Sequence, residues 1–264
     1  MLAPAAEDSD DERKRIGNSV LDYIRESTNI RKATVYRAMI CGELAPGGDR
    51  SELAAYFQRF IRHLQQQHHQ HQNSSDASGP SDIGQHGSIT GLLLIQPTSY
   101  LHVIESSTKT TVNVMTDLLS PHKSDSEPNL SSLVQGKPKL LLAQEDALAR
   151  FFPTWSSKIL DPPASREKDV DPDSLGSQEI LKTISEVCVN LLSLGSSLSS
   201  LPKSDVRQAV DEILEKYGEY TPRNTLVTAL AASDNVTYLS EWVEAMGPVN
   251  LKLEGDLVYP APKP

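Results

Sequence analysis

The sequence predicts an α+β sandwich, in which a mixed β-sheet carries two helices on one face and is followed by a helical C-terminal extension. Residues 89–105 hold two leucine-rich and β-branched runs on either side of a Pro-Thr-Ser turn, which is the pattern of a β-hairpin. Residues 51–67 repeat apolar side chains at helical spacing, so they predict an amphipathic helix that packs on the sheet. Residues 177–250 show helical spacing in several successive segments.

The elements before the helical extension follow the order β-α-β-β-α-β-β, which is the split βαβ arrangement of ferredoxin-like folds with one strand added. In chain order, the sequence predicts a short helix at 16–27, a strand at 33–40, a helix at 51–67, the hairpin strands at 89–95 and 100–105, a helix at 108–119, and strands at 138–143 and 155–160. Asp49 or Ser51 is the expected N-cap of the first long helix. The apolar run 89–95 indicates a strand covered on both faces, and Gly91 within it indicates a close approach by another backbone or a ligand.

Low-complexity and proline-containing stretches divide the chain into regions. These are a mostly disordered arm at 1–30, the sheet domain at 31–161, a linker at 162–176, the helical extension at 177–250 and an extended tail at 251–264. A Gln/His/Ser-rich insertion occupies 65–87. His68, His69 and His71 within it are potential zinc or copper ligands. The tract provides no fixed geometry, so we interpret it as a linker and expect no metal site.

The helical extension contains four predicted helices, at 177–194, 205–216, 221–231 and from 234 or 235 to 246. Thr221 and Pro222 are the expected N-cap and first residue of the third helix. The four helices can cover a face of the sheet, form a small bundle or dock on a partner. Tyr238 and Trp242 are the expected anchors for a partner, because aromatic residues dominate interface hot spots. That expectation fails if both side chains are fully buried in the chain's own core.

Composition predicts a soluble protein of the cytoplasm without choosing its role. The net charge of −10 argues against a nucleic-acid surface. Cys41 and Cys188, the only cysteines, give no disulfide framework or multi-thiolate zinc site. The acidic N-terminus lacks the apolar core of a signal peptide, and no apolar run approaches the ~18 residues of a membrane span. Without a nucleophile elbow, P-loop, dinucleotide-binding or HExxH motif, we expect no enzymatic activity.

Four segments in matching order resemble the BLUF domains, which are blue-light sensors that hold a flavin. The hairpin, reading ITGLLL, a turn and YLHVIE, is similar to the second and third BLUF strands. Residues 33–38 are similar to the first strand with its Tyr-Arg pair, and residues 139–155 to the fourth strand and the RxFxxW segment that follows it. The resemblance covers 31–161 and implies a BLUF-type sandwich.

The BLUF resemblance also implies a flavin site. Tyr36 matches the family's tyrosine and Trp155 its tryptophan. His102 stands where the family has the glutamine that contacts the flavin, Gly84 near the flavin-binding asparagine, and Ser157 at a methionine. Glycine has no side-chain amide, and serine lacks the thioether of methionine. We therefore interpret the flavin site as degenerate and expect no cofactor; the alternative is an FAD-binding light sensor that uses histidine in place of glutamine.

Strand periodicity predicts which polar residues near His102 can act together. His102 and Glu105 fall on opposite faces of their strand, so they are not expected to form an acid–base pair. Tyr36 and His102 are expected on the same face of adjacent strands, where the imidazole would satisfy the buried Tyr36 hydroxyl.

Residues 89–107 also resemble the testis-expressed protein 47 family of animal sperm and motile cilia, including His102 in place of glutamine. This resemblance implies a non-catalytic structural or adaptor protein of the cilium or sperm flagellum axoneme, within a radial spoke or another microtubule-associated complex of the cytoskeleton. The implied partners are other axonemal proteins, with neither nucleic acid nor membrane among them. Two alternatives remain: the FAD-binding light sensor, and an enzyme or nucleotide-binding regulator that uses the vacant flavin pocket, which no motif supports.

Overall fold

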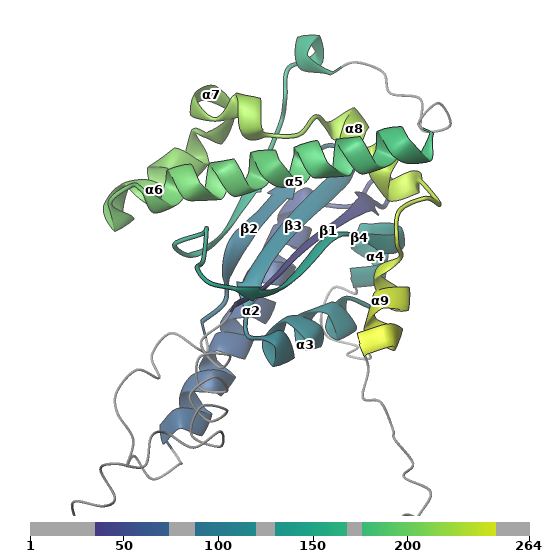
Figure 1. The fold of residues 1–264 in the computed structure, drawn as a ribbon. Helices are drawn as coiled ribbons and strands as arrows, with labels where there is room; N and C mark the ends of the chain where they lie inside the picture. The colour runs from purple at the N-terminus through teal and green to yellow at the C-terminus, as the bar shows by residue number, and fades with distance from the viewer. Residues whose placement is uncertain (1–34, 74–87, 120–129, 168–175, 247–264) are drawn as a thin grey trace, which may run out of the picture.

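The fold is built on a mixed five-stranded sheet with the strand order β4-β1-β3-β2-β5 (Figure 1). A computed structural model describes residues 35–73, 88–119, 130–167 and 176–246. The strands are β1 (Val35–Leu44), β2 (Thr90–Ile95), β3 (Ser99–Ser106), β4 (Val134–Ala147) and β5 (Trp155–Ile159). β2 and β5 run parallel, and the other neighbouring pairs are antiparallel.

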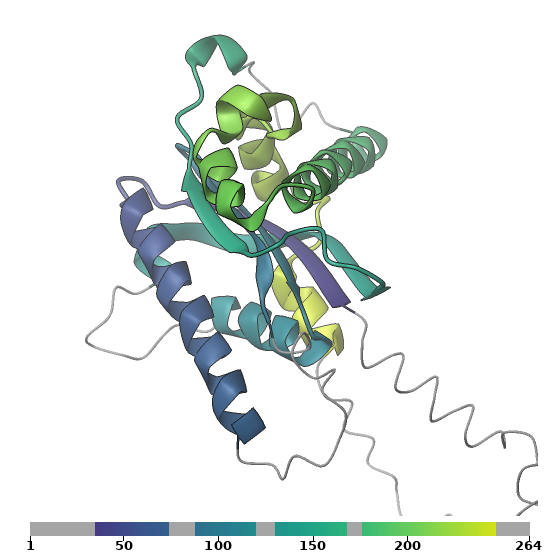
Figure 2. The ribbon, with the colours of Figure 1, turned by 90° about the vertical axis from the view of Figure 1, so that its left-hand side faces the viewer.

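Helices cover both faces of this sheet (Figures 1 and 2). One face carries α2 (Arg50–Asn73), α3 (Thr108–Leu119), α4 (Leu130–Leu133) and α9 (Leu239–Met246). The other face carries α5 (Ser177–Ser199), α6 (Lys203–Asp211), α7 (Ile213–Lys216) and α8 (Asn224–Ala232). Two 3₁₀ turns complete the fold, η2 (Ala164–Arg166) and η4 (Gly218–Tyr220).

Both faces are covered because successive side chains of the inner strands are apolar on either side of the sheet. On β2, Leu93 faces the α2 side, whereas Leu92 and Leu94 face α5. The α5 side chains Leu191 and Leu194 pack into the same cluster as Leu92 and Leu94. Helices α5 to α8 therefore cover one face of the sheet and complete its core. Of the three arrangements that the sequence allowed for the C-terminal helices, these four adopt the first.

The predicted α+β fold class and element order are confirmed. Helix α3 has the predicted bounds, and Asp49 caps α2 by accepting a hydrogen bond of 2.7 Å from the Ser51 backbone nitrogen. Gly91 does allow a close approach, and the approaching group is the backbone of β3: a Cβ on Gly91 would lie 2.0 Å from the Val103 carbonyl oxygen.

Several boundaries in the sheet domain differ from the prediction. Helix α2 continues to Asn73, so residues 65–73 of the Gln/His-rich insertion, including its three clustered histidines, are helical in their backbone rather than a linker. β4 begins at Val134, because it pairs with the C-terminal end of β1 as far as Leu44. Helix α4 occupies part of the predicted loop just before it. The predicted helix at 16–27 lies outside the described residues.

The start of α8 also differs from the prediction. The helix begins at Asn224 rather than at Thr221-Pro222, because the preceding segment is tied to other parts of the chain. The Thr221 hydroxyl donates to the Tyr217 carbonyl, and the Gln96 amide donates to the Pro222 carbonyl at 2.7 Å. The cap comes from far along the sequence: the Glu167 carboxylate accepts hydrogen bonds from the Asn224 and Thr225 backbone nitrogens.

Two general properties of the described residues bear on function. None of the helices in these ranges combines the length and apolar character that a bilayer crossing requires. Within the same ranges, no three or more histidine, cysteine, aspartate or glutamate side chains gather in a way that could hold a metal ion.

Candidate functional site

His102 lies in the middle of β3 with its side chain completely buried on the α2 side of the sheet. The Phe57 ring of α2 meets the imidazole edge-on, with ring centroids 4.8 Å apart. On the other side, the Trp155 indole nitrogen donates a 3.1 Å hydrogen bond to His102 Nε2. Because Nε2 accepts, the neutral imidazole carries its proton on Nδ1. This buried Nδ1 has no hydrogen-bond partner among the described residues.

Burial lowers the pKa of His102 to about 3, because the charged imidazolium would lose its hydration without gaining a partner. In the unfolded chain the pKa of a histidine is about 6.5. Above that pH the group is neutral in both states. As the pH falls from about 6.5 toward 3, His102 binds a proton in the unfolded state but stays neutral in the folded state, so the free energy of unfolding falls.

Replacing His102 by glutamine is therefore expected to remove part of the acid sensitivity of the fold. Between pH 7 and pH 5 the unmodified chain should lose about 2 kcal/mol of stability through His102, and the His102→Gln variant should lack this loss. Urea unfolding followed by circular dichroism at both pH values measures the difference. His63→Gln, which removes an exposed histidine of α2, is the control. An unchanged pH dependence in His102→Gln would contradict the burial argument.

The predicted contact between Tyr36 and His102 is wrong. The strand register pairs His102 with Ile40, whereas Tyr36 pairs with Ser106, four residues further along β3. Four residues of strand span about 13 Å, which is beyond hydrogen-bonding reach. The Tyr36 ring instead contacts the Trp242 ring of α9 at a centroid distance of 5.7 Å. Burial raises the pKa of the Tyr36 phenol to about 12.

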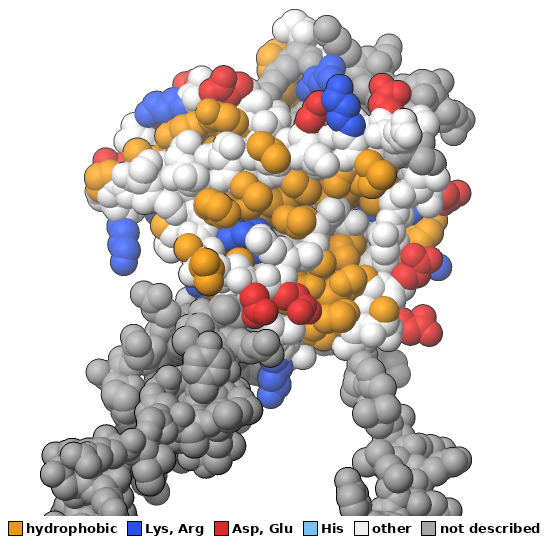
Figure 3. Space-filling model, viewed as in Figure 1, with side chains coloured by type: hydrophobic (Ala, Val, Ile, Leu, Met, Phe, Trp, Pro, Cys, Tyr) orange, Lys and Arg blue, Asp and Glu red, His pale blue; other side chains and the backbone are white. Residues whose placement is uncertain are grey.

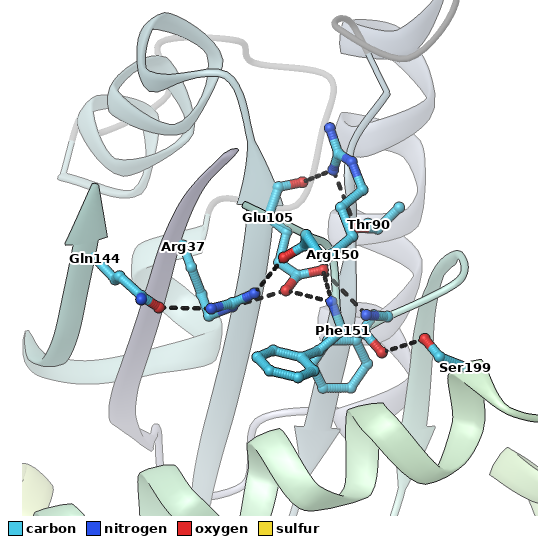
Figure 4. A network of polar contacts seen from close by, with 9 residues as sticks. Arg37, Thr90, Glu105, Gln144, Arg150, Phe151 and Ser199 are labelled. Atoms are coloured by element: carbon cyan, nitrogen blue, oxygen red, sulfur yellow. Dashed lines mark hydrogen bonds and ion pairs between the residues drawn. The ribbon is translucent and has the colours of Figure 1, made fainter. Parts of the chain in front are cut away.

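His102 and Glu105 do point to opposite faces of the sheet, as predicted, and Glu105 is the centre of a buried polar network (Figure 4). Its carboxylate accepts a 2.7 Å charged hydrogen bond from Arg37 Nε and a 3.0 Å bond from the Thr90 hydroxyl. It also accepts bonds from the backbone nitrogens of Phe151 and Phe152 at 2.9–3.1 Å. Every oxygen of the carboxylate is thus engaged by at least two donors.

The network links the sheet to the loop after β4 and to the end of α5 (Figure 4). Arg37 donates to the Gln144 side chain at 2.5 Å and to the Ala149 carbonyl at 2.8 Å, and its guanidinium lies 4.4 Å from the centre of the Phe151 ring. Ser199 at the end of α5 donates to the Phe151 carbonyl at 2.6 Å. These groups satisfy one another, so their role is structural. The signal missed in the sequence is a pair of charged residues, Arg37 and Glu105, that lie within two buried strands.

Two of the remaining flavin-site positions share a cleft that neither Tyr36 nor His102 lines. Trp155 and Ser157 lie on β5 and line an open cleft of about 460 Å³ between α2 and α6. Gly84 lies outside the described residues. A flavin stacked on His102 does not fit this arrangement, because Phe57 and Trp155 already contact both sides of the imidazole.

Tyr238 and Trp242 are half-buried and contact their own chain. The ammonium group of Lys139 lies 3.2 Å from the centre of the Tyr238 ring, whose hydroxyl donates to Asp234 at 2.6 Å. Trp242 packs on the Tyr36 side of the sheet. Since neither side chain is fully buried, their role as partner anchors stays a prediction.

The comparison with family models agrees with this architecture. The model of testis-expressed protein 47 matches residues 34–245, which spans nearly all of the described chain. The chain belongs to the testis-expressed protein 47 family. The relation predicted from residues 89–107 is therefore confirmed, and the match extends through the C-terminal helices as far as α9.

This member of the testis-expressed protein 47 family is also similar to solved structures, at low TM-scores. The BLUF structure of BlrP1 aligns with a TM-score of 0.32 and 14% identity, over 72% of this chain and 95% of that one. A bacterial light-regulated adenylyl cyclase aligns with a TM-score of 0.31 and 14% identity, over 67% of this chain and 39% of the cyclase. The Klebsiella pneumoniae BlrP1 complex with manganese and cyclic diGMP gives 0.30 and 13%, over 64% and 35%. Scores this low carry no argument about function.

Proposed function

We propose that this chain is a non-catalytic, BLUF-like structural or adaptor protein of the motile cilium or sperm flagellum axoneme, with other axonemal proteins as its partners. Its membership of the testis-expressed protein 47 family supports the sperm context. The observation that carries the non-sensory part of the proposal is the closed packing around His102. Phe57 and Trp155 occupy both sides of the imidazole, where a light sensor needs access to its flavin.

Exposed apolar side chains support a protein that assembles with others. Leu181 and Val189 of α5 are 64% and 59% exposed, and Leu148 after β4 is 91% exposed. In the view of Figure 3, hydrophobic side chains gather around α5 and below it. Contiguous exposed apolar surface is unusual on a protein that acts alone.

The proposal predicts a tightly held ciliary protein without a chromophore. After detergent extraction of sperm or ciliated cells, the native protein should remain with the axonemes, and high salt should be needed to release it. The purified chain should show no flavin absorption band before or after FAD is added. Recovery in the detergent-soluble fraction, with no axonemal pool, would overturn the axonemal assignment.

A blue-light sensor is the second candidate function, and one observation favours it. The Nδ1–H of His102 is a buried donor without a partner among the described residues, and such groups are costly unless a ligand or water accepts from them. FAD that binds stoichiometrically, with an absorption band that shifts to the red under blue light, would establish this function. The His102→Phe variant keeps an aromatic ring but lacks the Nδ1–H donor, so it should then lose the red shift of the flavin band.

A further inference from the structure

The open edge of strand β5 is the most distinctive unused surface in the described part of the chain. Among the described strands, β5 is the last of the sheet and pairs only with β2. Gly91 donates to the Thr154 carbonyl, and Leu160 donates to the Ile95 carbonyl. In a parallel pair of strands, residues that bond the neighbouring strand alternate with residues that do not. Because Thr154 and Leu160 bond β2, the β5 residues that bond it are the even-numbered ones. The backbone N–H and C=O groups of Trp155, Ser157 and Ile159 therefore point away from the sheet.

This edge lies at the bottom of a cleft between two helices. Figure 2 looks onto this side of the molecule, where β5 lies between α2 and the helices of the second face. The cleft has a volume of about 460 Å³ and is lined by residues 154–157 of the edge, by Gln58 of α2 and by α6. The helices therefore flank the edge at Trp155 and Ser157, and no described residue forms a backbone hydrogen bond with the outward groups there.

The α6 wall of the cleft carries two cations and one carboxylate. Lys203 and Arg207 both line it and are exposed, and neither forms an ion pair with any of the described residues. Asp211 also lines the cleft, but its carboxylate is 3.5 Å from the ammonium of Lys158. In a chain with a net charge of −10, two unpaired cations beside an open strand edge favour an acidic partner.

The two walls differ in a way that matches the side-chain alternation of a strand. Trp155, on the α2 side, presents a half-buried indole to the cleft, whereas Lys203 and Arg207 lie on the α6 side. In an added strand, successive side chains would point to α6 and to α2 in turn. Acidic residues at every second position would meet the cations, and the apolar residues between them would meet the indole.

We propose that the cleft binds an extended acidic peptide, which adds to the sheet as a sixth strand beside β5. Main-chain hydrogen bonds to Trp155, Ser157 and Ile159 would supply affinity, and Lys203 and Arg207 would select the acidic side chains. This surface does not depend on where in the cell the chain acts, so it can fail while the axonemal proposal stands.

Fluorescence anisotropy with labelled octapeptides tests the proposal on the full chain. A peptide of alternating glutamate and valine should bind saturably, with a Kd of about 100 μM or tighter. A lysine–valine peptide should bind at least about tenfold more weakly, because it meets like charge. Two further glutamate–valine peptides, N-methylated either at every valine amide or at every glutamate amide, keep the charge, and the one that loses the N–H groups facing β5 should bind about tenfold more weakly.

Variants of the chain give the second half of the test. Lys203→Glu/Arg207→Glu should weaken binding of the acidic peptide by about tenfold or more. Lys109→Glu/Lys182→Glu changes the net charge equally at exposed sites on α3 and α5 and should leave binding unchanged. The proposal is overturned if both double variants bind alike or if no saturation occurs. It is also overturned if both N-methylated peptides bind as well as the parent peptide, or if an oligothymidylate does. The peptide comparisons use the unmodified chain, so they decide the matter even if a variant does not fold.

Discussion

Replacing Glu105 by glutamine is expected to lower the free energy of unfolding by about 3–5 kcal/mol. Arg37 is 2% exposed and would keep its charge without the carboxylate that lies 2.7 Å away. The amide of glutamine also offers one acceptor oxygen where the carboxylate offers two. Its NH₂ group would face N–H donors of Phe151 or Phe152, and these would lose their acceptor. Urea unfolding followed by circular dichroism measures the loss.

The matched control is another glutamate in an ion pair, at the surface. Glu186 lies 3.9 Å from Lys182 on α5, and both side chains are more than half exposed. Glu186→Gln is expected to change the stability by less than about 0.5 kcal/mol, because solvent screens such a pair. Equal effects of the two substitutions would show that the network around Glu105 does not hold the loop after β4 and the end of α5 to the sheet.

Replacing Gly91 by alanine is expected to destabilise the fold by about 3 kcal/mol or more. Its φ of +144° is a conformation that side chains rarely adopt, and a Cβ would lie 2.0 Å from the Val103 carbonyl oxygen. The obstacle is backbone of the neighbouring strand, so the β2–β3 pairing itself must shift. Thermal unfolding and the yield of soluble protein both report the effect.

Two other glycines of the chain separate the effect of backbone strain from that of the close approach of β3. Gly136 also has a positive φ, of +68°, but a Cβ there meets nothing within 4 Å. Gly136→Ala should therefore cost only the backbone strain, about 1 kcal/mol. Gly176 has neither feature, so Gly176→Ala should have little effect on stability. If Gly91→Ala cost no more than Gly136→Ala, the close approach of β3 would not be the reason for glycine in β2.

Local patterns in the sequence were enough to predict the hairpin, helix α3 and the amphipathic helix α2. In each case the apolar period is a property of a short segment, and the fold class follows from the order of the segments. The same patterns failed where a distant residue sets the outcome. The start of α8 depends on Glu167, and the early start of β4 depends on its pairing with the end of β1.

In the candidate site, too, local patterns predicted what lies along one strand but not what depends on a neighbouring strand. Strand alternation correctly separated His102 from Glu105, because it needs only the parity of positions along one strand. It could not separate Tyr36 from His102, because their distance depends on the register between two strands.

The sequence by itself determined the family, the fold class and the apolar faces of the inner strands. Only the tertiary structure decided that α5 to α8 complete the core, that Glu105 gathers its donors from three distant segments, and that β5 keeps an open edge beside Lys203 and Arg207. The physical reason is that periodicity records which side of an element is apolar, whereas partners across the fold are chosen by register and packing among residues far apart in the chain.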